Sequence, residues 1–288
     1  MFQETDKDKI LKIIKDALYE DIGEGDITSA GLIPESAQIS GAFLAKEEGI
    51  LAGLALAKII FEEIDAMLAF QTFCNDGLKI RAGQQIACVS GNARSILAGE
   101  RLALNFLQRL SGIATLTAKF VKAIAGTPAK IYDTRKTTPN LRILEKSAVR
   151  FGGGYNHRMG LFDQVLIKDN HIAIAKKEGF ERLSDIVQRA REKVLAEAKI
   201  EIEVNNLDDF EDALAGHPDI IMLDNMSLAD MKKACDIVRN LPKRPLLEAS
   251  GNVALENVRQ VALAGVDIIS VGAITHSAKA LDISLELE

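Results

Sequence analysis

The sequence lacks most of the features that mark secreted, disulfide-bonded or membrane-spanning proteins. Its cysteines, Cys74, Cys88 and Cys235, are odd in number, widely spaced and without any Cys-x-x-Cys pair, which argues against a disulfide framework and against a zinc site. The N-terminal segment 1–7 is largely polar, so we expect no secretory signal. The longest apolar runs, such as residues 50–57, are too short to span a bilayer. We therefore expect a protein of the reducing cytoplasm.

Several familiar chemical motifs are missing as well. The chain has no Gly-x-x-x-x-Gly-Lys-Ser/Thr loop and no well-placed Gly-x-Gly-x-x-Gly, so neither NTPase nor dinucleotide chemistry is indicated. No Ser/His/Asp or Cys/His set stands out in the sequence. This absence favours electrostatic over covalent catalysis.

What the sequence does have is positive charge concentrated in one segment. Residues 130–168 contain eight Lys and Arg but three Asp and Glu, a formal +5, whereas the whole chain carries −6 and its remainder therefore about −11. A local basic cluster in an acidic protein indicates a pocket for a small polyanion. Nucleic acid is not indicated, because it needs an extended basic surface.

The apolar pattern divides the chain into two parts. The first part reads as α+β: an amphipathic helix over 8–19, short strands, a helix over 54–64 and a helix over 99–125 with a break at Ser111-Gly112. After Gly126, apolar runs recur at roughly the length of a βα unit, which predicts a parallel sheet or barrel. These runs are residues 129–132, 164–167, 200–204, 219–223, 245–247 and 266–271.

Polar residues gather at the ends of these predicted strands. Lys168, Glu203, Asp224, Ser250-Gly251 and Gly272 each end or follow an apolar run. A βα barrel builds its active site at the C-terminal ends of its parallel strands, so we expect one convergent site.

The basic residues fall into two groups with different interpretations. Arg135 and Lys136 follow a strand and His157-Arg158 follow a glycine triplet, so we assign these four to an anion site. A helix expected to be capped by Thr138, to start at Pro139 and to end at Gly152 carries the second group on one face, which we assign to the solvated surface. That group is Arg142, Lys146 and Arg150.

Glu203 and Asp224 are candidate ligands of one Mg²⁺ ion, because two carboxylates with open positions for water and phosphate suit this ion. The alternative is that either carboxylate pairs with Lys168. The loops Ser250-Gly251-Asn252 and Ser270-Val271-Gly272 resemble phosphate-binding loops. His171, His217 and His276 have no partner at metal-ligand spacing and are interpreted as structural. From the residues alone we expect a Mg²⁺-dependent barrel enzyme that acts on a phosphorylated anion.

Three longer motifs resemble the signature of the quinolinate phosphoribosyltransferase family. They are residues 133–139 (Asp-Thr-Arg-Lys-Thr-Thr-Pro), 152–161 (Gly-Gly-Gly-Tyr-Asn-His-Arg-Met-Gly-Leu) and 166–171 (Leu-Ile-Lys-Asp-Asn-His). The similarity also covers segments 20–29, 99–105, 222–226 and 248–251, and so nearly the whole chain. Asn140 and Asn252 depart from the family, many of whose members have glycine at these positions.

The resemblance implies an α/β fold: an irregular α/β barrel plus an N-terminal α/β open sandwich, as in type II phosphoribosyltransferases. The sandwich would comprise residues 1–113 joined by the C-terminal tail 274–288, and the barrel residues 114–273. Residues 281–286 alternate as an edge strand would, which agrees with a return to the first domain. The implied reaction converts quinolinate and phosphoribosyl pyrophosphate into nicotinate mononucleotide, pyrophosphate and CO₂, in NAD biosynthesis.

The resemblance also implies roles for individual residues. Lys136, Glu203 and Asp224 would be catalytic, with the two acids at the Mg²⁺ and the ribose. Arg101 would reach the quinolinate pocket of a second subunit in a homodimer or higher oligomer. The remaining substrate-binding residues would be Thr134, Arg135, His157, Arg158, Lys168, Ser250, Gly251, Asn252, Ser270, Val271 and Gly272.

Two other functions stay open at this point. One is that of a related protein encoded with molybdate transporters, which the intact motifs at 156–158 and 160–163 disfavour. The other is a non-catalytic barrel that senses a phosphorylated metabolite. Such a sensor would not need both Glu203 and Asp224.

Overall fold

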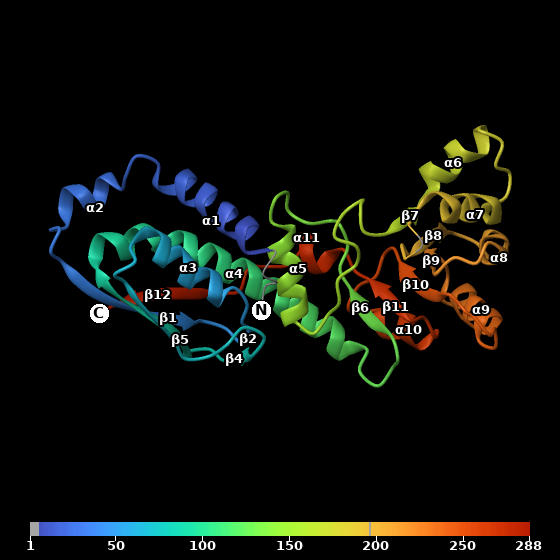
Figure 1. The fold of residues 1–288 in the computed structure, drawn as a ribbon. Helices are drawn as coiled ribbons and strands as arrows, with labels where there is room; N and C mark the ends of the chain where they lie inside the picture. Colours follow the sequence, from blue (N-terminus) through green and yellow to red (C-terminus); the bar gives the residue numbers. More distant parts are fainter. Residues whose placement is uncertain (1–5, 196) are drawn as a thin grey trace. The chain divides into compact units, whose positions relative to one another are not determined.

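The computed structural model describes residues 6–195 and 197–288. The first five residues, on which the expectation about a secretory signal partly rests, lie outside this range. The chain forms two compact units (Figure 1). Of the described residues, the first unit contains those up to Ala118 together with Thr137–Gly153 and Ile274–Glu288, and the second contains those of Lys119–Lys136 and Gly154–Ala273.

The first unit is built on an antiparallel sheet with strand order β12-β1-β5-β3 and a small β2-β4 pair. The strand β12 pairs with β1 at the sheet edge, which confirms the edge strand expected near residues 281–286. The elements of this unit are α1 (Lys7–Ile22), α2 (Ile27–Leu32), β1 (Gln38–Ala45), β2 (Gly49–Ile50), α3 (Leu54–Ile64), β3 (Ala69–Thr72), β4 (Lys79–Ile80), β5 (Gln85–Asn92), most of α4 (Ala93–Ala123), α5 (Arg142–Phe151) and β12 (Ile283–Leu287).

The helix α4 is continuous, so the expected break at Ser111-Gly112 is wrong. The Ser111 hydroxyl accepts a hydrogen bond from the Ala52 N–H at 2.9 Å and lies 3.1 Å from the Ala52 carbonyl oxygen. A Cβ at Gly112 would lie 2.1 Å from the Lys279 carbonyl oxygen. Both small residues therefore let other segments approach the helix closely. The expected domain boundary at residue 113 falls inside α4 and stays a prediction.

The second unit contains a parallel sheet of six strands in the order β6-β11-β10-β9-β8-β7. The described residues form no ladder between the end strands β6 and β7, so the barrel is irregular, as the resemblance implies. The strands are β6 (Lys130–Tyr132), β7 (Val165–Ile167), β8 (Ile200–Val204), β9 (Ile220–Asp224), β10 (Leu246–Ser250) and β11 (Ile268–Ser270). The helices are α6 (Asp169–Lys177), α7 (Leu183–Lys193), α8 (Leu207–Ala215), α9 (Leu228–Val238) and α10 (Val258–Leu263). The short α11 (Ala273–His276) begins at the last residue of this unit and otherwise belongs to the first.

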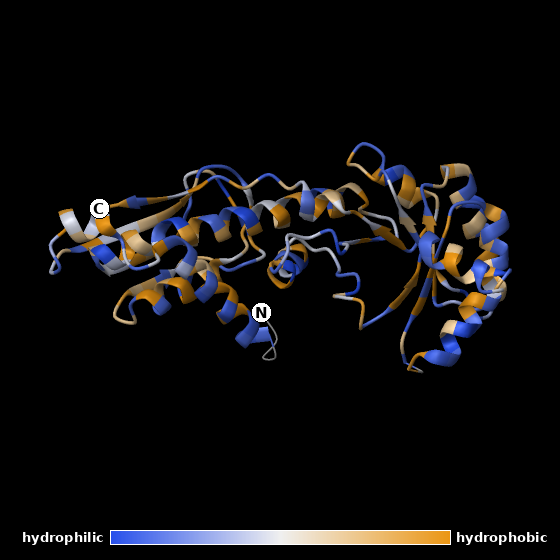
Figure 2. Cartoon of the chain, turned by 90° about the horizontal axis from the view of Figure 1, so that it is seen from above, coloured by the Kyte–Doolittle hydropathy of each residue, from blue (hydrophilic) through white to orange (hydrophobic). Residues whose placement is uncertain are grey.

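Side chains alternate between the two faces along each strand of this sheet, and this alternation places apolar and charged residues on opposite faces. Ile202, Ile221 and Leu247 are paired in register and buried on one face. Successive strand residues point to opposite faces, so Glu203 and Glu248 lie together on the other face, each paired with Met222. Figure 2 shows the strands of this unit mostly in the hydrophobic colour, flanked by helices of mixed polarity. The charged positions are therefore confined to one face of a mostly apolar sheet.

Two details of the helix expected over residues 139–151 are wrong. The helix α5 begins at Arg142 after Leu141, because Asn140 has a left-handed φ of 64° that interrupts the helical backbone. Lys146 is 1% exposed and thus buried, not part of a solvated face. Arg150 is exposed, as expected, and Arg142 is partly buried.

Glu145 of α5 is fully buried at the centre of a polar network in the first unit. Its Oε1 accepts hydrogen bonds from the Arg109 guanidinium at 2.7 Å and from the Thr138 hydroxyl at 2.8 Å. Arg109 also donates to the Thr275 carbonyl oxygen at 2.6 Å. This network joins α4, the segment before α5 and the C-terminal return of the chain.

We expect Glu145→Gln to lower the free energy of unfolding by about 3 kcal/mol, because it leaves the Arg109 charge without its buried partner. Asp16→Asn is the matched control, since Asp16 forms an exposed ion pair with Lys12 at 3.0 Å. Its effect should stay within about 0.5 kcal/mol. Urea denaturation of both variants measures the difference. Equal losses in the two would contradict a structural role for the network.

Candidate functional site

The carboxyl ends of the six parallel strands carry nearly all of the residues predicted to form the site. Parallel strands end at the same edge of a sheet, so these residues converge on one end of the second unit. The residues there are Thr134, Arg135 and Lys136 after β6, Lys168 after β7, Glu203 in β8, Asp224 in β9, Ser250, Gly251 and Asn252 at the end of β10, and Ser270, Val271 and Gly272 at the end of β11.

Glu203 and Asp224 lie on neighbouring strands, as predicted, and on the same face. The Glu203 carboxylate is 3.1 Å from the Lys168 ammonium, with the two side chains 16% and 45% exposed. This ion pair is the alternative interpretation of Glu203, and the structure contains it. Asp224 accepts a hydrogen bond from the Asn225 side chain at 2.8 Å. Two partly exposed carboxylates on adjacent strand ends fit a hard divalent cation such as Mg²⁺.

The loops after β9 and β10 are tied together by asparagine side chains. The Asn225 N–H donates to the Ser250 carbonyl oxygen at 2.9 Å, and the Asn252 amide donates to the Asn225 side-chain oxygen at 3.0 Å. Gly251 has a φ of 89°, and a Cβ there would lie 2.2 Å from the same Asn225 oxygen. Glycine at this position is thus required by both the backbone conformation and the close contact.

The two departures from the resembling family have one backbone explanation. Asn140 has a φ of 64° and Asn252 a φ of 50°. Glycine adopts this left-handed region most easily, and asparagine is among the side chains that tolerate it best. The exchange of glycine for asparagine therefore preserves the loop conformation.

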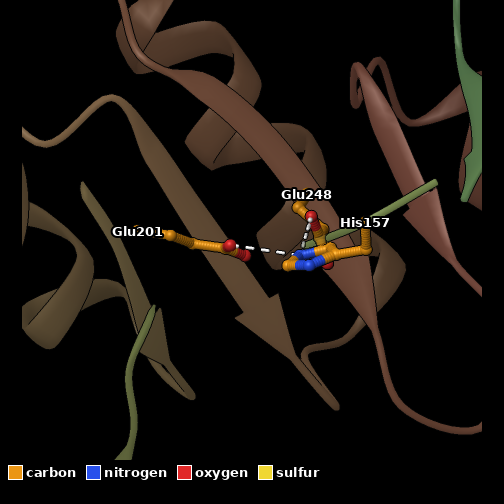
Figure 3. A group of neighbouring side chains, drawn as sticks. All are labelled: His157, Glu201 and Glu248. Atoms are coloured by element: carbon orange, nitrogen blue, oxygen red, sulfur yellow. Dashed lines mark ion pairs between the residues drawn. The ribbon is translucent and has the colours of Figure 1, made fainter. Parts of the chain in front are cut away.

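Beneath the strand ends lies a buried cluster of His157, Glu201 and Glu248 (Figure 3). The His157 ring lies between the two carboxylates, with Nε2 at 3.1 Å from Glu201 Oε2 and 3.4 Å from Glu248 Oε2. Both glutamates are fully buried. Buried carboxylates are costly to desolvate, so their contact with the ring is a major compensation for that cost.

The protons of this cluster are constrained by its contacts. The Arg158 backbone N–H donates to His157 Nδ1 at 2.8 Å, so the ring proton that faces the carboxylates is on Nε2. Burial acts to lower the pKa of His157, whereas its contacts with Glu201 and Glu248 act to raise it. The Arg158 N–H requires a lone pair on Nδ1, so the ring that makes this contact is neutral and carries its proton on Nε2. Burial, and then the charge of Glu248, raise the pKa of Glu201.

The chain segment around His157 is held by further polar contacts. Asp133, fully buried, accepts hydrogen bonds from the His157 N–H at 2.9 Å and from the Asn156 amide at 2.5 Å. The Gln164 amide donates to Glu201 Oε2 at 2.6 Å. These contacts fix the backbone that carries His157 and Arg158.

Arg158 is 8% exposed, and its guanidinium donates to the Gln164 carbonyl oxygen at 3.1 Å. Burial lowers its pKa, and the nearby charge of Arg135 acts in the same direction. The charge of Glu201 acts in the opposite direction. Two arginines close together at a strand-end site create a strong attraction for an anion with two negative groups.

Sequence reasoning did not assign Glu201 and Glu248 to the site. In the sequence, both glutamates stand within or beside apolar runs that predict strands, and we gave them no role. The signal that identifies them is a glutamate in the middle of a buried strand, two residues before a polar strand end. Glu201 precedes Glu203 in this way, and Glu248 precedes Ser250. Side chains at this spacing point to the same face.

The remaining predicted residues have varied surroundings. The Thr134 hydroxyl accepts from the Lys136 N–H at 3.0 Å, and the buried Ser270 hydroxyl has no hydrogen-bond partner among the described residues. His171 accepts from the Lys168 N–H at 3.0 Å, and His276 Nδ1 lies 2.6 Å from the Ser277 hydroxyl. His217 has a left-handed φ of 56°.

Arg101 is exposed on α4 of the first unit. Its apolar neighbours on this helix form no open surface, because the chain itself covers them. Those neighbours, Leu102, Leu104, Phe106 and Leu107, are all buried.

Within the described part of the chain, no helix has both the length and the apolar character needed to cross a membrane.

Comparison with known proteins gives consistent matches over the chain. The family model "Quinolinate phosphoribosyl transferase, N-terminal domain" matches residues 26–111, and "Quinolinate phosphoribosyl transferase, C-terminal domain" matches residues 113–286. A "Nicotinate-nucleotide pyrophosphorylase [carboxylating], chloroplastic" of Arabidopsis thaliana is 45% identical, over 96% of this chain and 82% of its own length. A "Quinolinate phosphoribosyltransferase [decarboxylating] 2b, mitochondrial" of Nicotiana tabacum is 43% identical, over 96% and 82%.

A solved structure has the same fold over nearly its full length. The nicotinate-nucleotide pyrophosphorylase of Francisella tularensis is 40% identical and superposes with a TM-score of 0.89, covering 98% of this chain and 96% of its own. The fold, the motifs at the strand ends and the family models therefore agree. The chain belongs to the quinolinate phosphoribosyltransferase family.

Proposed function

We propose that this enzyme transfers the phosphoribosyl group of phosphoribosyl pyrophosphate to quinolinate, with decarboxylation, and depends on Mg²⁺. The products are nicotinate mononucleotide, pyrophosphate and CO₂. The observation that carries the proposal is the convergence of Arg135, Arg158 and Lys168 with Glu203 and Asp224 at one end of a parallel sheet. This arrangement suits a substrate pair in which one member has two carboxylates and the other has phosphates and a ribose.

The cationic side chains would bind quinolinate. Arg135 and Arg158 offer planar guanidinium groups that match a carboxylate with two hydrogen bonds, and Lys168 adds a compact charge. His157 belongs to this end of the site by resemblance. Its ring nitrogens face Glu201, Glu248 and the Arg158 N–H, so we assign it an indirect part, through Arg158.

The other end of the site would bind phosphoribosyl pyrophosphate. Lys136 and Thr134 would contact the pyrophosphate end, and Glu203 and Asp224 would face the ribose and hold Mg²⁺. When bound, this ion would neutralise charge on the departing pyrophosphate. The 5′-phosphate would lie against the two loops Ser250-Gly251-Asn252 and Ser270-Val271-Gly272, where the buried Ser270 hydroxyl supplies a donor that no other described residue uses.

The chemistry follows from this arrangement. The bond from the ribose C1 to pyrophosphate breaks with its electron pair leaving on the pyrophosphate, and the quinolinate nitrogen forms a bond to C1. Carboxylates beside C1 stabilise the positive charge that develops there. The alkylated ring is then a pyridinium, which accepts the electron pair when the adjacent carboxylate leaves as CO₂. The ring carbon takes up one proton.

We also propose a cytoplasmic location and a homodimer or higher homo-oligomer. The location rests on the three unpaired cysteines. The names of the tobacco and Arabidopsis relatives place those two proteins in mitochondria and chloroplasts, respectively. The oligomer rests on the resemblance, which assigns Arg101 to the site of a second subunit. We infer neither a nucleic-acid partner nor a membrane partner.

Quinolinate should be turned over, and nicotinate at least tenfold more slowly, when each is supplied with phosphoribosyl pyrophosphate. Nicotinate has a single carboxylate, and a missing charge-assisted contact in a desolvated site costs about 1.5–3 kcal/mol. Product formation by the purified protein measures both rates. Equal rates would overturn the dicarboxylate assignment, and binding without any turnover would favour a metabolite sensor.

Glu203→Gln and Asp224→Asn should each lower kcat by at least tenfold and leave the melting temperature nearly unchanged, because both carboxylates act on the substrate and its metal. Glu211→Gln, an exposed acid on α8, is the control and should keep full activity. Removal of Mg²⁺ with a chelator should abolish wild-type turnover. A variant that unfolds while its folded fraction stays fully active would assign that acid to the fold instead.

If Arg101 completes the site of a second subunit, Arg101→Ala and Lys136→Ala homodimers should both be nearly inactive. Mixed dimers of the two should recover about half of the wild-type activity, since one of their two sites then has both residues intact. Asn105→Ala, exposed one turn away on α4, is the control and should be active by itself. Purified mixed dimers as inactive as their parents would remove Arg101 from the site.

A further inference from the structure

The cluster of His157, Glu201 and Glu248 has more buried charge than the reaction itself uses. Glu201 and Glu248 are fully buried, and neither lies at the exposed end of its strand. An ionic group in a barrel interior does not by itself stabilise a fold, because apolar side chains of similar size often do as well or better. Burying two carboxylates is thus costly for folding, and we ask which group they hold in place.

We propose that Glu201 and Glu248 are positioning residues which, through His157, hold Arg158 at the quinolinate subsite. The inference rests on the proposed function. It assigns to this function two residues that do not touch the substrate.

First, Glu201 and Glu248 hold the His157 ring. Glu201 and Glu248 come from β8 and β10, which flank β9, and meet His157 Nε2 from two sides at 3.1 and 3.4 Å (Figure 3). Contacts with two carboxylates from separate strands thus hold the ring from two sides. Glu201 is itself oriented by the Gln164 amide at 2.6 Å.

The second step links the ring to Arg158. A ring held at Nε2 presents Nδ1 in one direction, where it accepts the Arg158 N–H at 2.8 Å. The preceding N–H, that of His157, is held by Asp133 at 2.9 Å. The backbone from which the Arg158 side chain departs is therefore fixed by two consecutive hydrogen bonds.

The third step concerns charge. Arg135 and Arg158 repel each other, and the charges of Glu201 and Asp163 offset this repulsion for Arg158. The buried Glu201 carboxylate thus favours the charged form of Arg158, the form that a dianionic ligand requires. Loss of the cluster should thus weaken quinolinate binding and leave the phosphoribosyl pyrophosphate end untouched.

The alternative for these residues is a metal centre, because the donor atoms of His157, Glu201 and Glu248 all lie within 4.8 Å of one another. Glu201 Oε2 already accepts the Gln164 amide and contacts His157 Nε2, which favours the positioning role, because a metal ion bound there would displace these partners. Metal analysis of the purified protein distinguishes the two.

The variants are Glu248→Leu, which removes the acceptor and keeps an apolar side chain, and Glu248→Gln, which keeps one acceptor oxygen. We expect Glu248→Leu to raise the KM for quinolinate at least tenfold, with the KM for phosphoribosyl pyrophosphate within twofold and no loss of melting temperature. Glu248→Gln should recover part of the quinolinate affinity. Met222→Leu, buried in the same register row on β9, is the control and should change neither KM.

A second measurement does not depend on activity. In nitrogen-15 NMR spectra of the wild type, His157 should give a ring N–H signal shifted downfield by its carboxylate partners, assigned by its loss in His157→Gln. That signal should weaken or vanish in Glu248→Leu and persist in Met222→Leu.

The proposal is overturned if both KM values rise together, if only the melting temperature falls, or if the His157 signal is unchanged in Glu248→Leu. A stoichiometric metal in the wild type that Glu248→Leu loses would overturn it in favour of a metal centre. If the wild type does not use quinolinate, the proposed function fails instead, and the NMR signal still tests the hold on the ring.

Discussion

The parallel register of the six-stranded sheet is the constraint on which the site depends. Backbone hydrogen bonds align Glu203, Met222 and Glu248 in one row, and Asp224 with Ser250 two residues further along the strands. A slip of one residue in any strand would turn its glutamate into the apolar layer beneath the helices. The cost of burying an unpaired carboxylate there makes such a slip unfavourable. The same alternation that builds the core thus gathers the charged groups on the opposite face.

Burial divides the charged residues of this face into two levels. Glu203, Asp224 and Lys168 retain partial exposure, so a substrate or an ion can replace their present partners. Glu201 and Glu248 are fully buried, where a partner is exchanged far less easily. The partly exposed residues are therefore suited to bind and release substrates. The fully buried glutamates are suited to hold other side chains in a fixed orientation.

Polar networks also hold the polypeptide segments that are remote in sequence. Arg109 and Glu145 join α4, α5 and the C-terminal return through side-chain and carbonyl contacts. Asn225, Ser250 and Asn252 join two neighbouring strand-end loops. In the first case the Arg109 side chain also satisfies the Thr275 carbonyl oxygen, a backbone group outside any strand ladder. The left-handed asparagines belong to this pattern, because they keep the turns that glycine would make.

The sequence by itself determined the fold class, the strand ends that carry the site and the family. Runs such as 200–204 and 220–224 have a period and length that single strands require, and motifs such as 133–139 are long enough to be specific. Such patterns can be recognised without the tertiary structure, because each depends only on residues a few positions apart in the chain.

Tertiary structure alone decided the rest. The burial of Lys146, the continuity of α4 through Ser111-Gly112 and the covering of Leu102 and Phe106 depend on segments far away in the chain. The contact of His157 with Glu201 and Glu248 likewise depends on the strand order β10-β9-β8, in which β8 and β10 lie on opposite sides of β9. Contacts between such distant residues are set by packing and register, and no local periodicity encodes them.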